Sequence, residues 1–406
     1  MTETVRTPRI VGLEGPRGFA SLCVIVVHTF GLTAPTVTGA THIYLAGQLV
    51  AFFFVLSGFL IYLPFCRAML LGRPAPSLRR YASQRVRRVF PAYLVTFLIA
   101  NFVLAAVFVV NATDVLTGRS DAGTGRITDP WALLGQITLV NNLIPSQLQT
   151  GINPSWSLTT ELCFYLLLPL VAAATAALVR RRGWRPVPLM VMPAIFVAVG
   201  IVTKVLLELW QARHPEVSDP TAYFGDSWAA VFTRSLLGQA DLFGYGMAVV
   251  IIFVTMTQGG LPTWTGRRLQ AWCWSLVVLG LAATVVCVEL TIRLDTTFFG
   301  IACGAAILLI VEPTARGKEA RLGRLTDWEP FRLVGVISLS AYLWHYPVLV
   351  LMTRWDLIGA DTYAGALQSA VVVLAVTLVV SAVSYRFVEK PAMRVAPSAT
   401  VLPDPT

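Results

Sequence analysis

The chain has 406 residues and a formal net charge of +10; 56% of its residues are hydrophobic and only 13% are charged. A soluble domain carries roughly 25% charged residues, so the composition excludes an ordinary soluble protein and indicates an integral membrane protein. The positive charge does not indicate a nucleic-acid site, because the basic residues lie in short segments between apolar runs and leave no soluble domain to bind nucleic acid.

The apolar runs predict an all-α integral membrane fold, a bundle of about ten transmembrane helices, because a spanning helix needs roughly 20 apolar residues. We expect one transmembrane domain over residues 1–394 and a disordered tail over 395–406. An eleventh apolar stretch, residues 131–145, is short and contains two asparagines, so it is expected to lie at the interface or to re-enter. The predicted spans are residues 17–34, 43–65, 91–110, 156–179, 187–209, 228–256, 272–292, 297–311, 333–353 and 364–385.

Lys and Arg predict the orientation of the spans, because they gather in cytoplasmic loops. If the N-terminus is cytoplasmic and residues 131–145 do not cross, most basic residues lie in inside segments. The loop residues that would then lie outside are Arg119, Arg126, Arg213, Arg293 and Arg354. Both termini are therefore expected on the cytoplasmic side.

Ionisable residues within spans are costly and by default indicate function. Lys204 and Glu208 can pair with each other at i, i+4. Arg234, Asp241 and Tyr245 share a face that suits a structural role in helix packing. The full set within or near the spans is His28, Glu161, Lys204, Glu208, Arg234, Asp241, Glu289 and His345.

The stretch LEGPRGFASLCVIVVHTFG, residues 13–31, places Arg17 and His28 eleven residues apart. Eleven helical residues turn through three turns plus about 20°, so the two side chains share one face, about 16 Å apart along the axis. Glu14 falls near the same face if the helix reaches that far. This face can connect the cytoplasmic interface with mid-membrane; the alternative is a snorkelling Arg and a His bonded to a neighbouring helix.

The stretch WSLTTELCFYLLLPL, residues 156–170, places Ser157, Glu161 and Tyr165 on one helix face. A carboxylate at this depth needs a partner or a proton. The alternative to a functional Glu161 is a structural ion pair, for which Arg234 is the candidate partner.

In SLSAYLWHYPVL, residues 338–349, Ser338, Tyr342 and His345 share a face. On the predicted topology His345 lies at a depth not far from Glu161 and His28. The alternative is a core histidine that bonds a tyrosine or a backbone carbonyl.

Residues 77–93, SLRRYASQRVRRVFPAY, predict an amphipathic helix on the cytoplasmic surface. The apolar stripe of this helix consists of Leu78, Ala82, Val86 and Val89. Arg85 falls inside the stripe and is expected to point into the protein, whereas Arg88 lies away from it. An inward-pointing arginine suits a phosphate; the alternative is contact with anionic lipid head groups.

The cysteines show no spacing typical of a metal site or a disulfide framework, so we predict no metal. They are interpreted as small packing residues. They are Cys23, Cys66, Cys163, Cys273, Cys287 and Cys303.

Six stretches together resemble the membrane acyltransferase-3 family of bacterial O-acyltransferases. The family's motif of a basic residue, ten spacers and a histidine falls on Arg17 and His28, and its R-x-x-R motif falls on Arg85 and Arg88. The stretches run in family order from about Arg9 to Arg394: LEGPRGFASLCVIVVH, FFFVLSGFLIY (52–62), RRYASQRVRRVFPAY, WSLTTELCFYLLLPL, SLSAYLWHYPVL and YRFVEKP (385–391).

Three positions depart from the family pattern. Glu14 stands where members often have Asp, and Pro16 replaces a usual aliphatic residue. Leu162 stands where many members have a second acidic residue, so Glu161 is the only carboxylate in that motif.

The resemblance implies a multi-pass enzyme of the plasma (inner) membrane that uses acyl-CoA, expected to be acetyl-CoA, as a donor substrate and holds no permanent cofactor. It implies transfer of an acetyl or other short acyl group to a hydroxyl, and we expect a cell-envelope glycan or glycolipid as acceptor. Two alternatives stay open: the same chemistry on a small natural product such as a macrolide, and a proton-coupled transporter that uses the buried residues as a relay.

The implied roles fall on three groups of residues. The coenzyme A phosphates are expected at Arg85 and Arg88, with Arg17 as a further contact, and the pantetheine arm beside the Arg17 face. His28 is expected to act as general base or as acyl carrier, and Ser57 has no evident base in the sequence. Either Glu14 or Glu161 would orient the imidazole, and the residues expected to line the acceptor pocket are Ser157, Tyr342 and His345.

Overall fold

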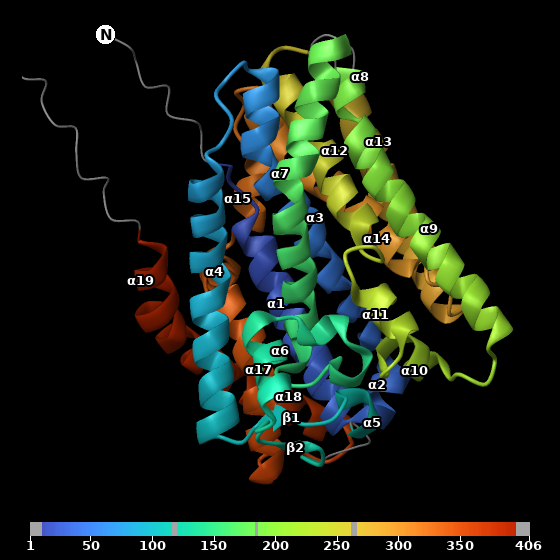
Figure 1. Ribbon diagram of the computed structural model, residues 1–406, viewed down its shortest axis with the longest axis vertical. Helices are drawn as coiled ribbons and strands as arrows, with labels where there is room; N and C mark the ends of the chain where they lie inside the picture. Colours follow the sequence, from blue (N-terminus) through green and yellow to red (C-terminus); the bar gives the residue numbers. More distant parts are fainter. Residues whose placement is uncertain (1–9, 116–119, 183–185, 261–265, 395–406) are drawn as a thin grey trace, which may run out of the picture.

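The computed structural model describes residues 10–115, 120–182, 186–260 and 266–394, which form a bundle of helices (Figure 1). Within these ranges the strands are limited to β1, Val107–Phe108, and β2, Thr124–Gly125, which pair antiparallel with Val107 opposite Gly125. The predicted tail, residues 395–406, lies outside the described residues.

The described residues contain nine helices long and apolar enough to cross a membrane, or ten if a bent pair counts as one span. This confirms the all-α membrane bundle and the predicted number of spans. The spans are α1 Glu14–Thr33, η1 Ile43–Gln48 with α3 Leu49–Leu70, α4 Leu78–Leu98 with η2 Ile99–Val103, η5 Asn153–Ser155 with α7 Trp156–Arg182, α9 Val191–Arg213, α12 Ala240–Thr257, α13 Arg267–Glu289, α14 Asp295–Ala315, the bent pair α16 Glu329–Val336 and α17 Ser338–Arg354, and α18 Tyr363–Ser384 with η7 Tyr385–Glu389 and α19 Lys390–Met393.

Shorter elements complete the two ends of the bundle. In Figure 1 α8 and the connection from α3 to α4 lie at the upper end, whereas α2, α5, α10 and the β1–β2 pair lie at the lower end. The upper end is the one that the basic loops predict to be cytoplasmic. The shorter elements are α2 Pro35–Thr41, α5 Ala112–Val115, α6 Pro130–Thr138, η3 Asn141–Leu143, η4 Pro145–Gln147, α8 Pro186–Leu189, α10 Asp219–Phe224, α11 Trp228–Arg234 and α15 Arg321–Thr326.

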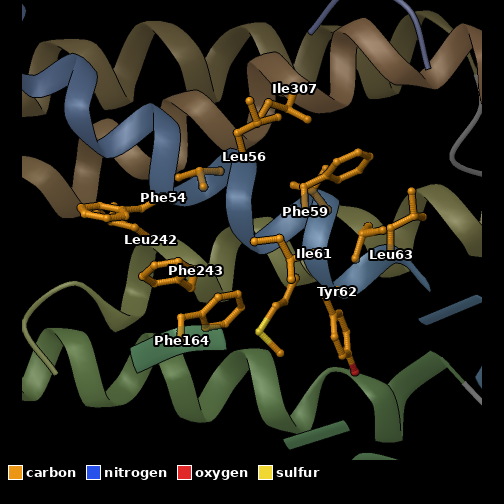
Figure 2. Close-up of a cluster of buried hydrophobic side chains, with 14 of the residues drawn as sticks. Phe54, Leu56, Phe59, Ile61, Tyr62, Leu63, Phe164, Leu242, Phe243 and Ile307 are labelled. Carbon is orange, nitrogen blue, oxygen red and sulfur yellow. The ribbon is translucent and has the colours of Figure 1, made fainter. Parts of the chain in front are cut away.

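The centre of the bundle is an aromatic core between α3, α7 and α12 (Figure 2). The rings of Phe164 and Phe243 stack with centroids 4.1 Å apart, and Phe54 packs on Phe243 at 5.2 Å. Glycines let α3 and α12 approach closely, since a Cβ on Gly58 would lie 2.3 Å from the Phe243 carbonyl oxygen. Helices α9 and α13 are mostly exposed and lie at the outside, where lipid would contact them.

The predicted surface helix at residues 77–93 is not a separate element. It is the first part of α4, which continues through Pro91 and runs along the bundle (Figure 1). The side chains of Leu78 and Val86 are 62% and 50% exposed, so most of the apolar stripe faces outward, toward lipid. Arg85 lies at the edge of the stripe beside the buried Val89, and this edge faces the protein.

The single span predicted over residues 228–256 is also wrong, because α11 ends at Arg234 and α12 begins at Ala240. At the break, a Cβ on Gly238 would lie 2.4 Å from the Phe232 carbonyl oxygen, and the side-chain amide of Gln239 donates to the Thr233 carbonyl at 2.8 Å. The turn thus satisfies backbone groups that a continuous helix would have paired. Arg234 and Asp241 therefore do not share a helix face.

The predicted pairing of Lys204 with Glu208 is replaced by contacts between helices. The Lys204 ammonium donates to Asp241 Oδ2 at 2.7 Å and to Thr297 at 2.8 Å, which ties α9 to α12 and α14. Glu208 lies 3.9 Å from Arg293. A buried charge needs a close opposite charge, and Asp241, which is fully buried, provides it.

The stretch 131–145 does not cross, as its length and asparagines predict. Helix α6 has 9 residues, and the Thr159 hydroxyl of α7 donates to the Leu139 carbonyl at 2.7 Å. Asn142 donates to Ser155 and Thr159 at 3.2 and 3.1 Å. The polar side chains of this stretch therefore hold it against the start of α7.

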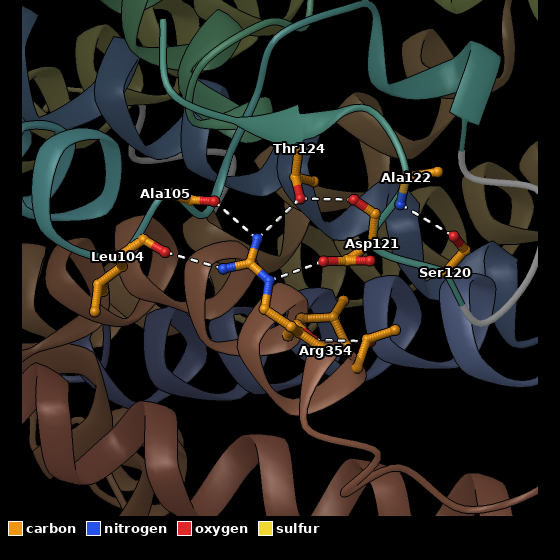
Figure 3. A network of polar contacts seen from close by, with 9 residues as sticks. Leu104, Ala105, Ser120, Asp121, Ala122, Thr124 and Arg354 are labelled. Atoms are coloured by element: carbon orange, nitrogen blue, oxygen red, sulfur yellow. Dashed lines mark hydrogen bonds and ion pairs between the residues drawn. The ribbon is translucent and has the colours of Figure 1, made fainter.

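Arg354 anchors the lower end of the bundle (Figure 3). Its guanidinium donates to the carbonyl oxygens of Leu104 and Ala105 at 3.0 and 2.8 Å, and pairs with Asp121 at 2.8 Å. It also donates to Thr124 at 3.2 Å. These bonds fix the β1–β2 segment beside the end of α17.

Candidate functional site

Two adjacent cavities lie within the bundle. The first has a volume of about 270 Å³ and the second about 520 Å³. Val50, Phe54 and Tyr342 line both cavities, so the cavities meet at these three side chains, which are called the partition below.

The first cavity is rich in guanidinium groups. Arg17 comes from the first turn of α1, and Arg85 and Arg88 come from the inward side of α4. Arg17 donates to Ser338 at 3.0 Å, and the Arg85 guanidinium lies 5.6 Å from the centre of the Tyr165 ring. Arg17 lies near the start of α1, and Arg85 and Arg88 lie in the first half of the span formed by α4 and η2.

Glu161 also lines the first cavity, where it accepts a hydrogen bond of 2.5 Å from Ser57. The structure thus supplies a carboxylate partner for Ser57 that the sequence did not reveal. It does not pair Glu161 with Arg234, which lines the second cavity. Three cations and one carboxylate leave the first cavity positive, which suits an anionic ligand.

Arg17 lines the first cavity and His28 lines the second, so the two side chains face different but adjacent cavities. A ligand that contacts both would pass the side chains that the two cavities share, which include Phe54 and Tyr342.

His28 pairs with a second histidine. Its Nδ1 lies 2.9 Å from Nε2 of His345, and Nδ1 of His345 lies 2.7 Å from the Tyr342 carbonyl oxygen. A carbonyl only accepts, so Nδ1 of His345 carries a proton. In a neutral pair its Nε2 then accepts the proton of His28 Nδ1.

This chain of bonds defines the tautomer of His28. With the proton on Nδ1, its Nε2 holds a free lone pair. His28 lines the second cavity, whereas His345 lies behind it and is fully buried. His28 is therefore the histidine that a ligand in the cavity can reach, and its unprotonated nitrogen can act as a base.

The structure corrects the expectation that a carboxylate orients His28. Glu14 lines a separate small pocket with Arg324, Asp327 and Arg332, about 21 Å along α1 from His28. Glu161 faces the first cavity. The group that contacts the His28 ring nitrogen is the imidazole of His345, not a carboxylate.

Of the three residues predicted for the acceptor pocket, Tyr342 belongs to the partition and Ser157 to the first cavity. Their hydroxyl oxygens lie 2.8 Å apart, and the Tyr342 hydroxyl donates to the Pro154 carbonyl at 3.0 Å. Ser157 and Tyr342 therefore hold the partition, and His345 supports His28.

The second cavity is lined by several polar side chains, most of which the sequence did not single out; Lys204 and Arg234 are the exceptions. Tyr223 and Arg293 lie on one another, with the guanidinium 3.8 Å from the ring centre. Burial raises the pKa of the Tyr223 phenol well above its ordinary value, so it stays protonated. These residues come from segments between spans, where no helical period marks them. Other polar lining residues are Gln48, Thr113, Gln149, Asn153, Lys204, Arg234, Gln239 and Asp295.

A family model described as an acyltransferase domain matches residues 10–386. The putative peptidoglycan O-acetyltransferase YrhL of Bacillus subtilis is 26% identical over 94% of this chain and 54% of its own length. The peptidoglycan O-acetyltransferase OatA of Listeria monocytogenes is 24% identical over 96% of this chain and 57% of its own. This chain thus spans about half the length of these two relatives.

The acyltransferase MdmB of Streptomyces mycarofaciens is similar along nearly its whole length. It is 27% identical over 98% of this chain and 96% of its own. No solved structure is significantly similar to the chain.

Proposed function

The chain belongs to the acyltransferase family whose model matches residues 10–386, and from this premise we propose that it moves an acetyl or other short acyl group from acyl-CoA to a hydroxyl of a cell-envelope glycan or glycolipid. Family membership makes it a multi-pass membrane acyltransferase and argues against the transporter alternative. The names of two relatives, both peptidoglycan O-acetyltransferases, support a glycan acceptor.

The observation that carries the proposal is that the two adjacent cavities are lined by different functional groups. The first holds three arginines, and the second is lined by His28, whose Nδ1 is bonded to His345 and whose Nε2 is left unprotonated. Coenzyme A has a matching shape: phosphates at one end, and a thioester at the end of a long flexible arm. Arg85, Arg88 and Arg17 would bind the phosphates, since guanidinium groups form paired bonds with phosphate oxygens.

The thioester would reach the second cavity through the partition. Rotation of the Tyr342 and Phe54 side chains would admit the thin arm of coenzyme A while the nucleotide end stays at the arginines. The upper end of Figure 1 would face the cytoplasm, where acyl-CoA is made, with both termini on that side. The second cavity would receive the acceptor from the opposite side of the membrane.

His28 would act as the general base. Its Nε2 takes the proton of the acceptor hydroxyl as the hydroxyl oxygen attacks the thioester carbonyl carbon. The tetrahedral intermediate collapses, the carbon–sulfur bond breaks, and the proton passes from His28 to the leaving thiolate. The products are an ester and free coenzyme A. The same lone pair would serve an acyl-carrier role if His28 attacked the thioester itself.

Replacing Arg85 or Arg88 by glutamine is expected to raise the KM for acetyl-CoA about tenfold or more with a smaller effect on kcat. Each change removes charge-assisted bonds to phosphate, which contribute about 1.5–3 kcal/mol. The measurement is the steady-state release of free coenzyme A thiol by purified protein.

Arg87 provides the matched control, because it lies on the same helix but its side chain is exposed and does not line the first cavity. Arg87→Gln should leave the KM within twofold of wild type. An equal rise in all three variants would show a general effect of positive charge, and would contradict a phosphate site at Arg85 and Arg88.

A second candidate acceptor is a small natural product such as a macrolide. The similarity to the Streptomyces acyltransferase, whose name gives no glycan acceptor, is as great as the similarity to the peptidoglycan O-acetyltransferases and supports this candidate. In that case the donor site and chemistry stay the same. Mass spectrometry of envelope glycans and secreted metabolites from hosts with and without the gene distinguishes the two acceptors.

A further inference from the structure

We infer that Arg234 binds an anionic group of the acceptor, a carboxylate or a phosphate, in the second cavity. This inference rests on the proposed function for the identity of the second cavity as the acceptor site. It narrows the acceptor to a class of substrate, because the site would select a negatively charged acceptor over a neutral or cationic one.

The first argument is the charge balance of the cations that line this cavity. Lys204 is paired with Asp241 at 2.7 Å, and Arg293 lies 3.9 Å from Glu208. Arg234 has no carboxylate within ion-pair distance anywhere in the described chain. A buried charge without a counterion is costly, so this guanidinium is where an anion would be stabilised most.

The second argument is how Arg234 is held. Its guanidinium carbon lies 4.5 Å from the centre of the Trp156 ring and 4.3 Å from that of Phe224. Its Nε donates to the Tyr223 carbonyl at 3.3 Å. The aromatic rings and this bond fix the plane of the group without using its terminal nitrogens, which have no hydrogen-bond partner among the described residues.

The third argument is location. Arg234 is only 8% exposed, yet it lines the same cavity as His28. A planar, immobilised guanidinium with two free terminal nitrogens forms paired bonds with a carboxylate or phosphate. An acceptor held there by its anion would place a hydroxyl elsewhere on the same molecule near His28.

The test measures binding and does not depend on catalysis. Full-length purified protein is titrated with N-acetylmuramic acid, with its uncharged methyl ester, and with N-acetylglucosamine 1-phosphate, and the shift in Tm gives the apparent affinity of each. We expect the acid or the sugar phosphate to bind at least about tenfold more tightly than the ester. The anion that binds more tightly shows whether the site prefers a carboxylate or a phosphate.

Arg234→Gln should weaken binding of the preferred anion at least about tenfold, and Arg234→Lys should weaken it less because the charge remains. Arg126→Gln is the control, since Arg126 is exposed and lies outside both cavities. The inference is overturned if neither anion binds more tightly than the ester, or if binding of the preferred anion survives in Arg234→Gln. The comparison of the two anions with the ester in the wild type decides the question even if the variants do not fold.

Failure of this inference and failure of the proposed function are distinguishable. If the wild type releases coenzyme A thiol in the presence of an acceptor but shows no preference for anions, only the role of Arg234 is lost. If it binds the anion but never consumes acyl-CoA, the anion site stands and the donor is wrong.

Discussion

His28→Ala is expected to lower the rate of acyl transfer by about 10³-fold or more. General-base catalysis by a positioned side chain contributes about 10²–10⁴-fold, and no other histidine lines the second cavity among the described residues. The hydroxyl would have to attack without losing its proton to a base. The measurement is kcat with labelled acetyl-CoA and the acceptor identified by mass spectrometry.

His214→Ala is the matched control, because His214 lies at the end of α9 and packs on Trp210, away from both cavities. It should retain activity within twofold. A His28→Ala protein with wild-type Tm and more than a tenth of wild-type activity would exclude His28 as the base.

His345→Phe is expected to lower kcat about 10²-fold or more, although His345 does not line the cavity. Phenylalanine fills the space but cannot accept the proton of His28 Nδ1. The His28 ring is then free to take the other tautomer, in which Nε2 is protonated and cannot act as a base. A wrong tautomer of a catalytic histidine costs about 10⁴-fold in a serine protease.

His345→Gln distinguishes this positioning role from simple packing. The glutamine amide oxygen can occupy roughly the position of Nε2 and accept the same bond, so this variant should recover at least about tenfold over His345→Phe. Equal losses in both variants would mean that His345 acts only through its shape. Full activity in His345→Phe would remove it from the mechanism.

The spans could be predicted from the sequence because, in a chain with so few charged residues, a long apolar run can hardly form anything other than a transmembrane helix. The break between Arg234 and Ala240 could not, since it depends on the close approach of Gly238 to the Phe232 carbonyl and on the bond from the Gln239 side chain to the Thr233 carbonyl. Residues 77–93 form the start of a longer helix and not a separate surface helix. The sequence does not reveal this, because an apolar stripe looks the same whether it faces the protein or the lipid.

The candidate site also has features that the sequence predicts and features that it does not. Helical geometry alone places Arg17 and His28 on one face, and motif resemblance points to Arg85 and Arg88. The bond between His28 and His345 joins residues that lie 317 positions apart, and no local pattern reveals such a pairing. Nor does the sequence show that Phe54 and Tyr342 lie where two cavities meet on the predicted route.

The most direct test of the account uses sealed vesicles in which the orientation of the protein is known. Labelled acetyl-CoA is added to the face that carries Arg85 and Arg88, and a membrane-impermeant acceptor is placed either on that face or on the other. The account predicts that the acceptor is labelled only when it lies on the face opposite the labelled acetyl-CoA. Equal labelling with both substrates on the Arg85 and Arg88 face would contradict it.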